Sequence, residues 1–412
     1  MPRTDRRVVV TGMAALTALG DTWASVGAAL RAGTSGVRYM ADWERYEGLN
    51  TRVAAPIVAF RAPPHYNRKV TRSMGSVALL ATCCTEQALR DAGLLENPEI
   101  RSGAMGVAYG SCIGSTDATM EFSSMITSGA VGGINATTYL RLMPHTTCAN
   151  IGVYFGLKGR VIPACSACTS GSQSIGFAYE AIKYGQQQMM VAGGAEELCA
   201  PEAAVFDTLY AASQKNDTPH LTPAPFDRDR DGLVIGEGAG TLVLEELEHA
   251  RARGARIVAE LVGFASNSDG DHLTHPNTQT MEVAMRMALA DAALPPTAIG
   301  YVNAHATATE QGDIAESQAM HRLFGARMPV STLKGHLGHT LGACGAIESW
   351  AAIEMMNGDW YAPTLNLVNL DPRCGELDYI TGAGRRLQSQ YVMNNNFAFG
   401  GVNTSLIFRR CD

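Results

Sequence analysis

The sequence predicts an α/β protein in which helices cover parallel or mixed sheets, and two observations support this fold class. Strand-like apolar segments alternate with amphipathic helical segments along the whole chain, which is typical of sheets covered by helices. Of the 412 residues, 46% are apolar, only 17% are charged and 43 are glycine, as in a compact chain with many tight turns. The alternation forms two comparable series, so we predict an internal duplication with halves at 1–254 and 255–412.

The first series begins with the three valines of residues 8–10, which are β-branched and precede a glycine, as in a buried strand. The best-defined helix of the series, over 169–184, places Ile175, Ala178 and Ile182 on one face. The other expected elements are a helix over 76–92, strands over 105–109, 161–163 and 189–192, a strand pair over 231–236 and 239–245, and a charged helix over 247–253.

The second series repeats this alternation with shorter apolar segments. We expect strands over 257–263, 299–303, 329–330, 392–395 and 404–409, and helices over 281–293, 313–324 and 342–356. Since residue identity between the two series is weak, the duplication is inferred from the order of the elements alone.

Composition excludes several functional classes. The balance of 32 Lys and Arg against 39 Asp and Glu gives a net charge of −7, which offers nucleic acid no general attraction. No apolar stretch reaches the roughly 18–20 residues that a helix needs to cross a bilayer. The ten cysteines are scattered through apolar contexts, so we expect reduced thiols in a cytoplasmic protein. Cys165 and Cys168 have metal-pair spacing, but no second pair of ligands exists, so we predict no metal site.

Cys168 is the first candidate for chemistry, because an apolar strand leads through small residues into the helix that follows it. At a helix N-terminus, unpaired backbone N–H groups and the positive end of the dipole favour a thiolate. The thiolate is the nucleophilic form, so the position suits an acyl-transfer cysteine. The alternative is that Cys168 is a small buried residue, as most free cysteines are.

Three more candidates lie at the ends of expected elements. His305 follows the strand over 299–303, and the carboxyl ends of strands are where ligands bind in open α/β sheets. Lys334 and His339 precede the helix over 342–356. Taken singly, His305 also fits a structural role, Lys334 an ordinary ion pair and His336 local scaffolding. A thiolate candidate, two imidazoles and a lysine, all at element ends, together predict a catalytic site.

The glycine turn over 395–403 is the last candidate, with Phe399 beside Gly400 and Gly401. Glycines allow backbone conformations that aim N–H groups at a ligand. A backbone N–H in this turn would complete an oxyanion hole with that of Cys168. A plain turn between two C-terminal strands fits the spacing equally well.

With these residues in view, the sequence resembles the chain-elongating β-ketoacyl-acyl carrier protein synthases, which have a cysteine and two histidines at their centre. The resemblance covers nearly the whole chain and rests on motifs in the family's order, at 7–12, 167–171, 191–196, 225–227, 230–232, 303–305, 338–339 and 397–401. It implies a thiolase-like fold, in which two βαβ-rich halves form five layers (αβαβα). It also implies a homodimer, with a heterodimer of paralogues as the alternative.

The resemblance assigns roles to individual residues. It implies that Cys168 is the acylated nucleophile and that His305 and His339 assist decarboxylation of a malonyl thioester. It also implies a polar network of Lys334 with Asp313, Glu316 and Glu348. Thr307 and Thr309 would contact the phosphopantetheine arm, and Ile113 would contact the acyl chain in its pocket. Phe399 would act as a gate and supply an oxyanion-hole N–H, and Gly400 and Gly401 would contact the substrate.

The implied reaction is a decarboxylative Claisen condensation. An acyl group on Cys168 is attacked by the carbanion formed when malonyl-acyl carrier protein loses carbon dioxide, which gives β-ketoacyl-acyl carrier protein. Because loss of carbon dioxide drives the step, we expect no metal, nicotinamide or flavin cofactor. Two imidazole N–H donors stabilise the enolate only if both point at the thioester oxygen.

Acyl carrier proteins are strongly acidic, so an enzyme of net charge −7 needs a local basic patch for docking. The best candidate is Arg68, Lys69 and Arg72, with Lys215 as a second position, and both match docking regions of the family. An ordinary solvated helix face is the alternative for these residues.

Departures from the family pattern at Ala306, Ala308 and Ala398 replace glycine or serine, and Ala398 predicts a stiffer gating loop. They leave open whether the enzyme serves fatty acid elongation or a dedicated polyene or polyketide pathway. A thiolase acting on coenzyme A thioesters would carry a second catalytic cysteine in the 395–403 segment, which has none. A non-catalytic chain-length factor would lack the nucleophile at 168.

Overall fold

The computed structural model describes residues 5–58 and 60–411. Its main sheet has eleven strands in the order β12-β10-β9-β14-β15-β8-β1-β7-β6-β4-β5. The strands are β1 (Val8–Leu16), β4 (Met105–Gly110), β5 (Val161–Ala164), β6 (Met189–Glu196), β7 (Gly238–Glu246), β8 (Ala259–Ser268), β9 (Ile299–Asn303), β10 (Pro329–Ser331), β12 (Asp378–Tyr379), β14 (Tyr391–Ala398) and β15 (Val402–Arg410).

The sheet consists of two five-stranded units with the same topology, and β12 extends the second one. In each unit four strands run in one direction and the fourth strand in the order, β7 or β15, is antiparallel to them; the orders are β5-β4-β6-β7-β1 and β10-β9-β14-β15-β8. The units join where Val8, Val9 and Val10 pair with residues 259–261 of β8. The duplication that element order predicts is therefore present in the strand topology.

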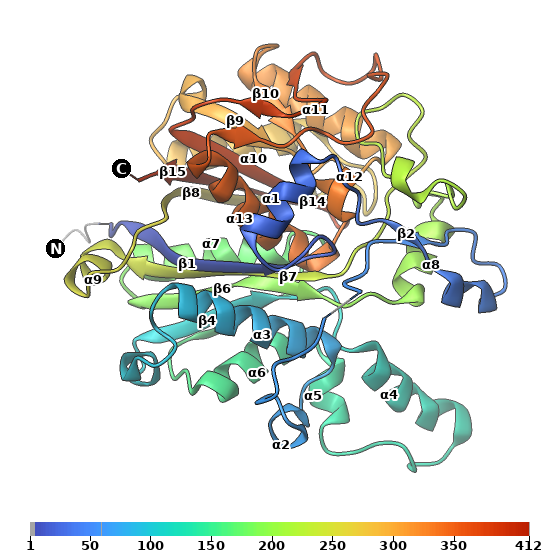
Figure 1. Ribbon diagram of the computed structural model, residues 1–412, viewed down its shortest axis with the longest axis vertical. Helices are drawn as coiled ribbons and strands as arrows, with labels where there is room; N and C mark the ends of the chain where they lie inside the picture. The colour runs from blue at the N-terminus through green and yellow to red at the C-terminus, as the bar shows by residue number, and fades with distance from the viewer. Residues whose placement is uncertain (1–4, 59, 412) are drawn as a thin grey trace.

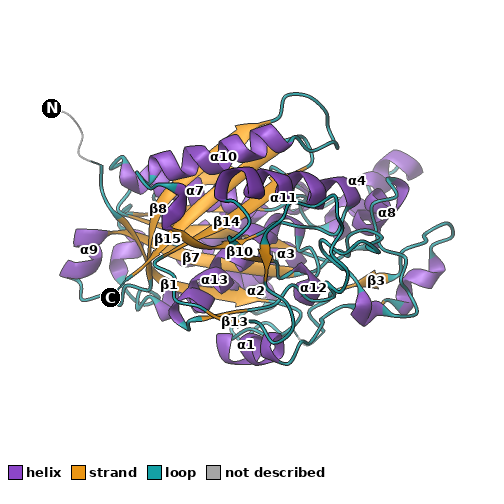
Figure 2. Ribbon diagram, turned by 90° about the horizontal axis from the view of Figure 1, so that it is seen from above, coloured by secondary structure: helices purple, strands orange, loops and turns teal. Residues whose placement is uncertain are grey.

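Helices form three layers around these two units (Figures 1 and 2). The central helices α7 (Ser170–Lys183) and α13 (Cys344–Asn357) contact strands of both units. On the outer faces, α3 (Ser76–Asp91) and α6 (Thr146–Phe155) cover the first unit, and α10 (Thr278–Asp291) and α11 (Glu310–Phe324) cover the second. The expected five-layer α/β arrangement is confirmed.

The two central helices approach closely at their N-terminal ends because glycine occupies the contact. A Cβ added at Gly171 would lie 2.9 Å from the carbonyl oxygen of Gly342, and one added at Gly345 would lie 2.7 Å from the backbone nitrogen of Ser172. Side chains there would force the helices apart. The first turns of α7 and α13 therefore meet in the centre of the molecule, and both helices bring a cysteine to this point.

Shorter elements lie around this core, and α4 and α5 project from the first unit (Figure 1). They are α1 (Trp23–Arg31), α2 (Arg68–Thr71), α4 (Thr116–Ser128), α5 (Thr138–Leu142), α8 (Ala200–Thr208), α9 (Leu247–Ala252), α12 (Lys334–Leu337), β2 (Arg38–Tyr39), β3 (Val53–Ala54), β11 (Trp360–Tyr361) and β13 (Arg385–Arg386). No helix among the described residues combines the length and apolarity needed to cross a membrane.

The expected strand pair at 231–236 and 239–245 is wrong, because only the second segment forms a strand, β7. The first segment makes isolated bridges instead, with Leu233 opposite Ala212 and Ile235 opposite His339. The backbone N–H of His339 donates to the carbonyl of Val234 at 2.7 Å. Residues 231–236 therefore support the loop that carries His339 instead of extending a hairpin.

Candidate active site

Cys168 lies in a tight turn immediately before α7. Ala167 has a φ of +50°, in the left-handed region that non-glycine residues rarely adopt, and Thr169 is at the N-cap position of the helix. Cys168 is 7% exposed and lines a cavity of about 440 Å³. The strained turn presents the sulfur to this cavity, as expected from its place at the helix start.

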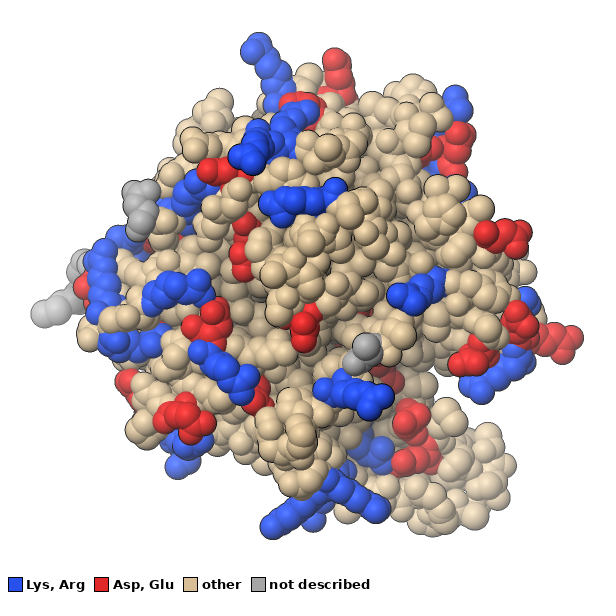
Figure 3. Space-filling model, in the orientation of Figure 1, with Lys and Arg blue, Asp and Glu red and all other residues tan. Residues whose placement is uncertain are grey.

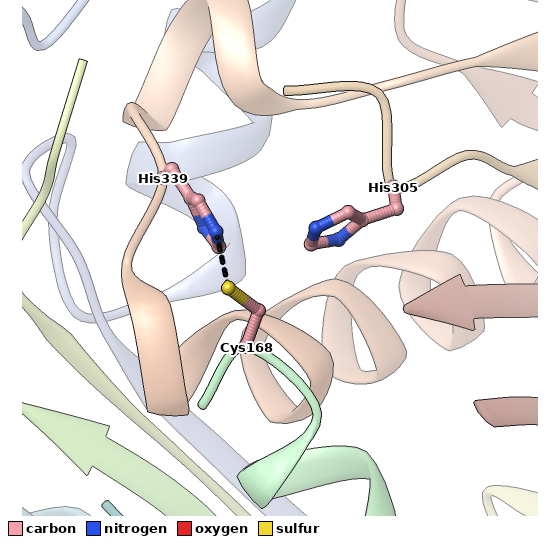
Figure 4. A group of neighbouring side chains, drawn as sticks. All are labelled: Cys168, His305 and His339. Carbon is pink, nitrogen blue, oxygen red and sulfur yellow. Dashed lines mark hydrogen bonds between the residues drawn. The ribbon is translucent and has the colours of Figure 1, made fainter. Parts of the chain in front are cut away.

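Two imidazoles face this sulfur from the second unit, as Figure 4 shows. His305 follows β9, and His339 follows α12. The Nε2 atom of His339 lies 2.9 Å from Cys168 Sγ, and the two rings are 5.1 Å apart at an interplanar angle of 85°. All three residues line the cavity. The structure thus brings together the nucleophile and both histidines predicted from sequence.

Hydrogen bonds to the Nδ1 atoms set the tautomer of both rings. The backbone N–H of Leu341 donates to His339 Nδ1 at 3.3 Å, and the side-chain amide of Asn396 donates to His305 Nδ1 at 3.4 Å. Since each Nδ1 accepts a hydrogen bond, the ring proton of a neutral imidazole is on Nε2. Both Nε2–H groups are then donors available to the cavity.

Burial determines the charge of these groups. Burial, together with the positive charge of Lys334, holds the pKa values of His305 and His339 well below the usual range, so both rings are neutral. Burial also raises the pKa of Cys168 to about 12, although Lys334 acts to lower it. The resting sulfur is therefore a thiol, in contrast to the thiolate expected from the helix end, because desolvation outweighs the nearby positive charge.

Lys334 is buried and forms an ion pair with Glu348. The other oxygen of Glu348 accepts a hydrogen bond from Asn396 at 2.7 Å, and Asn396 in turn contacts His305. Sequence reasoning missed Asn396 as a site residue. The signal for it is the run of three asparagines at 394–396 inside an otherwise apolar strand, where buried amides need partners.

Asp313 and Glu316 hold the backbone of the His305 loop and make no hydrogen bond or ion pair with Lys334. Glu316 accepts hydrogen bonds from the backbone N–H groups of His305 at 2.8 Å and Ala306 at 2.7 Å. Asp313 accepts one from Ala308 at 3.0 Å. The network expected around Lys334 is thus divided, because only Glu348 reaches the ammonium group.

This loop is strained where the carboxylates hold it. Ala306 has a φ of +26° and Ala308 a φ of +66°, so both lie in the left-handed region. The hydroxyls of Thr307 and Thr309 are 2.9 Å apart, and both residues line the cavity. The loop therefore aims its hydroxyls into the cavity at the expense of backbone strain.

Phe399 lies on the cavity wall, with its ring 5.7 Å from that of Phe206. Gly400 and Gly401 have φ values of +87° and +71°, and the Gly400 N–H donates to the carbonyl of Leu273 at 2.7 Å. Gly401 lines the cavity. Ile113 is 37% exposed and lies outside the cavity lining in the single chain.

The predicted docking residues lie away from the catalytic groups. Arg68, Lys69 and Arg72 are exposed at α2, and Figure 3 shows basic side chains gathered at this end of the molecule. Lys215 differs from them, because its ammonium group lies 3.8 Å from a carboxylate oxygen of Asp231 and donates to the carbonyl of Asp229. Its charge is largely compensated within the chain.

Comparison with known proteins agrees with this geometry. Residues 5–250 match the model of the β-ketoacyl synthase N-terminal domain, and residues 258–368 match that of the C-terminal domain. The chain therefore belongs to the β-ketoacyl synthase family. It is 38% identical to 3-oxoacyl-[acyl-carrier-protein] synthase 2 of Vibrio cholerae, over 98% of this chain and 99% of the relative.

Other relatives and solved structures agree. Synthase 1 of Escherichia coli strain K12 is 34% identical over 98% of this chain and 99% of its own. A crystal structure of a β-ketoacyl synthase from Burkholderia phymatum STM815 superimposes with a TM-score of 0.98 at 57% identity, over 99% of this chain and 100% of that one. The ishigamide ketosynthase/chain length factor gives a TM-score of 0.89 at 29% identity, with 99% and 100% coverage.

Proposed function

We propose that this enzyme catalyses the decarboxylative Claisen condensation of malonyl-acyl carrier protein with an acyl group held on Cys168, which yields β-ketoacyl-acyl carrier protein. The single observation that carries the proposal is the convergence of one thiol and two imidazole Nε2–H groups in one cavity. The relatives named 3-oxoacyl-[acyl-carrier-protein] synthase support the same reaction.

In the first half-reaction the Cys168 sulfur attacks the thioester carbonyl of the acyl donor. The thiol proton passes to solvent as the sulfur attacks, and the carrier thiolate takes up a proton as it departs. The His339 Nε2–H, 2.9 Å away, stabilises the developing sulfur anion. We assign the backbone N–H groups of Cys168 and Phe399 to the oxyanion of the tetrahedral intermediate. Expulsion of the carrier thiol leaves the acyl-enzyme, while Thr307 and Thr309 hold the phosphopantetheine arm.

In the second half-reaction the malonyl thioester loses carbon dioxide, and its thioester oxygen gains negative charge. Two neutral Nε2–H groups, from His305 and His339, donate to that oxygen and stabilise the enolate. The enolate carbon attacks the acyl carbonyl on Cys168 and forms a carbon–carbon bond, the thioester bond to Cys168 breaks, and the departing thiolate takes a proton from solvent, which restores the thiol. The step needs no external oxidant or reductant, and the two imidazole N–H groups stabilise the enolate, so we expect no metal, nicotinamide or flavin cofactor.

We further propose that the chain works as a homodimer in the cytoplasm. The strand β5 is a sheet edge on which Val161 is 53% exposed, and helix α4 of the same unit exposes Met120 at 66% and Ile126 at 77%. An open edge strand and exposed apolar side chains are features that a second copy of the chain would cover. A paralogue in that position is the second candidate, since the ishigamide structure pairs a ketosynthase with a chain length factor.

Intact-mass spectrometry with a panel of acyl carrier thioesters tests the proposed function. We expect one acyl group per chain, located on Cys168 after digestion, and a β-ketoacyl product once malonyl-acyl carrier protein is added. The panel also reports chain length, which bears on fatty acid against polyene or polyketide synthesis. If no thioester increased the mass at Cys168, the chain would instead be a non-catalytic chain-length factor.

Docking of the acidic carrier is tested by charge reversal at Arg68, Lys69 and Arg72. We expect the Michaelis constant for the carrier-bound substrate to rise about tenfold at low salt, and added salt to reduce the difference. Lys215→Glu tests the second predicted docking position separately, and we expect a smaller rise because its charge is already paired with Asp231. Equal constants for the triple variant and the wild type at low salt would reject this docking surface.

A further inference from the structure

The side-chain amide of Asn396 lies at the centre of a buried polar cluster beside the catalytic cavity. Its nitrogen donates to Glu348 Oε2 at 2.7 Å, and it lies 3.4 Å from His305 Nδ1 and 3.6 Å from Cys344 Sγ. His305, Cys344 and Glu348 each place one polar atom within 4.8 Å of those of the other two, and all four residues are buried. A single amide group therefore separates three acceptors that are otherwise close neighbours.

The neighbours of this amide fix its orientation. Glu348 forms an ion pair with Lys334, so both oxygens of the carboxylate act as acceptors. The Asn396 Oδ1 atom accepts a hydrogen bond from the Asn394 amide at 3.4 Å. If the Asn396 amide were turned over, its oxygen would lie 2.7 Å from the Glu348 oxygen, acceptor against acceptor. One N–H of Asn396 therefore bonds to Glu348, and the other faces His305 Nδ1.

The group that faces Nδ1 decides what the other nitrogen of an imidazole can do. A carboxylate beside Nδ1 holds the ring proton on that nitrogen and leaves Nε2 as a base. An N–H donor beside Nδ1 has the opposite effect and keeps the proton on Nε2. Glu348 is close enough to His305 to compete for its Nδ1, and the Asn396 amide bonds to both of them.

We propose that Asn396 is a positioning residue that shields His305 from the Glu348 carboxylate and thereby makes His305 an N–H donor instead of a base. The enolate oxygen needs a donor, and an Nε2 atom without its proton would repel it. His339 does not depend on Asn396, because the backbone N–H of Leu341 faces its Nδ1. The inference rests on the proposed condensation and adds a residue to its second half-reaction.

Two substitutions at position 396 test this inference. Asn396→Asp keeps the shape of the side chain, but its proton is shared with Glu348, so an acceptor oxygen faces His305 Nδ1. Asn396→Leu removes the amide and leaves Glu348 free to attract the ring proton. In both variants we expect decarboxylation of malonyl-acyl carrier protein to fall about 10²-fold, since one donor to the enolate is lost. Acylation of Cys168, which uses His339, should change by less than about threefold. Intact-mass time courses of the carrier and of the enzyme measure the two rates.

The position of the ring proton is a readout that a merely structural role would not move. Nuclear magnetic resonance of the enzyme labelled with 15N-histidine distinguishes a protonated ring nitrogen from an unprotonated one, and His305→Ala identifies the His305 signals by their loss. We expect the proton on Nε2 of His305 in the wild type and on Nδ1 in both Asn396 variants.

The matched control is Asn395→Asp, the same change at the neighbouring buried asparagine. Successive side chains of a strand point to opposite faces, and Asn395 contacts Ser405 and Met285 instead of the cluster. This variant should melt at a lower temperature, and its decarboxylation rate per folded molecule and His305 tautomer should match the wild type.

The outcomes also separate this inference from the proposed function. If both Asn396 variants kept the proton on Nε2 of His305, the role of Asn396 would be overturned and the function would stand. Equal losses of acylation and decarboxylation would overturn it as well, because they indicate a structural role. Absence of condensation by the wild type with every thioester overturns the function itself.

Discussion

The two halves of the molecule each bring a cysteine to the first turn of a central helix, yet only one of these cysteines is placed for catalysis. Cys168 precedes α7, lines the cavity and faces His339 Nε2 at 2.9 Å. Cys344 begins α13, lies outside the cavity lining, and donates its S–H to the carbonyl of Cys168 at 3.2 Å. A helix N-terminus is common to both, so it does not by itself create a nucleophile. Access to the cavity and an imidazole partner make the difference.

The largest expected effect compares alanine substitutions at these two cysteines. Cys168→Ala should lower the condensation rate by about 10⁴-fold or more, because the covalent intermediate is lost. Cys344→Ala removes one hydrogen bond to a carbonyl and should lower the rate by less than about tenfold. Product formation followed by mass spectrometry measures both. Comparable losses in the two variants would mean that the two helix ends are functionally equivalent.

The imidazole partner is tested by removing each ring in turn. Decarboxylation of malonyl-acyl carrier protein should fall about 10²–10³-fold in both His305→Ala and His339→Ala, since each loses one donor to the enolate oxygen. Acylation of Cys168 should slow markedly only in His339→Ala, because His305 makes no hydrogen bond to the sulfur.

The matched control for this pair is His336→Gln, whose ring contacts the carbonyls of Thr34 and Pro363 outside the cavity. It should alter stability and leave decarboxylation per folded molecule unchanged. If both alanine variants decarboxylated malonyl-acyl carrier protein at the wild-type rate, the two imidazoles would not be the groups that stabilise the enolate.

The smallest expected effect is the pH dependence of alkylation. Because the pKa of Cys168 is raised to about 12, the reactive thiolate is a small fraction near neutral pH and grows with pH. The alkylation rate at Cys168 should therefore rise about tenfold per pH unit between about pH 7 and 9. Burial raises the pKa of Cys344 well above its usual value, and that thiol should stay unmodified. If the alkylation rate of Cys168 reached a plateau below pH 9, the helix N-terminus would stabilise the thiolate more than burial destabilises it.

The sequence was sufficient to predict the residues that meet in the candidate active site, because each is at the end of a strand or helix whose boundary is locally encoded. Cys168 before α7 and His305 after β9 are examples. The sequence did not predict properties that depend on tertiary packing. The raised pKa of Cys168, the amide of Asn396 beside His305, and the anchoring of the 305–308 backbone by Glu316 all arise where segments distant in sequence meet.

The failed strand pair at 231–236 has the same origin. Its alternation of apolar residues and glycines is that of a hairpin, but Ile235 finds its partner at His339, more than a hundred residues away. Local patterning predicts that the segment is extended, and only the tertiary structure determines what it pairs with.

The boundary between the two five-stranded units, where β1 pairs with β8, also separates the residues of the active site. The first unit contributes the sulfur of Cys168 and the second contributes the rings of His305 and His339, so neither unit alone contains a complete active site. Severing the backbone between β7 and β8 would yield two fragments that are each inert, and turnover would return only on reassembly. The cavity at the boundary of the two units therefore combines functional groups that neither unit contains alone.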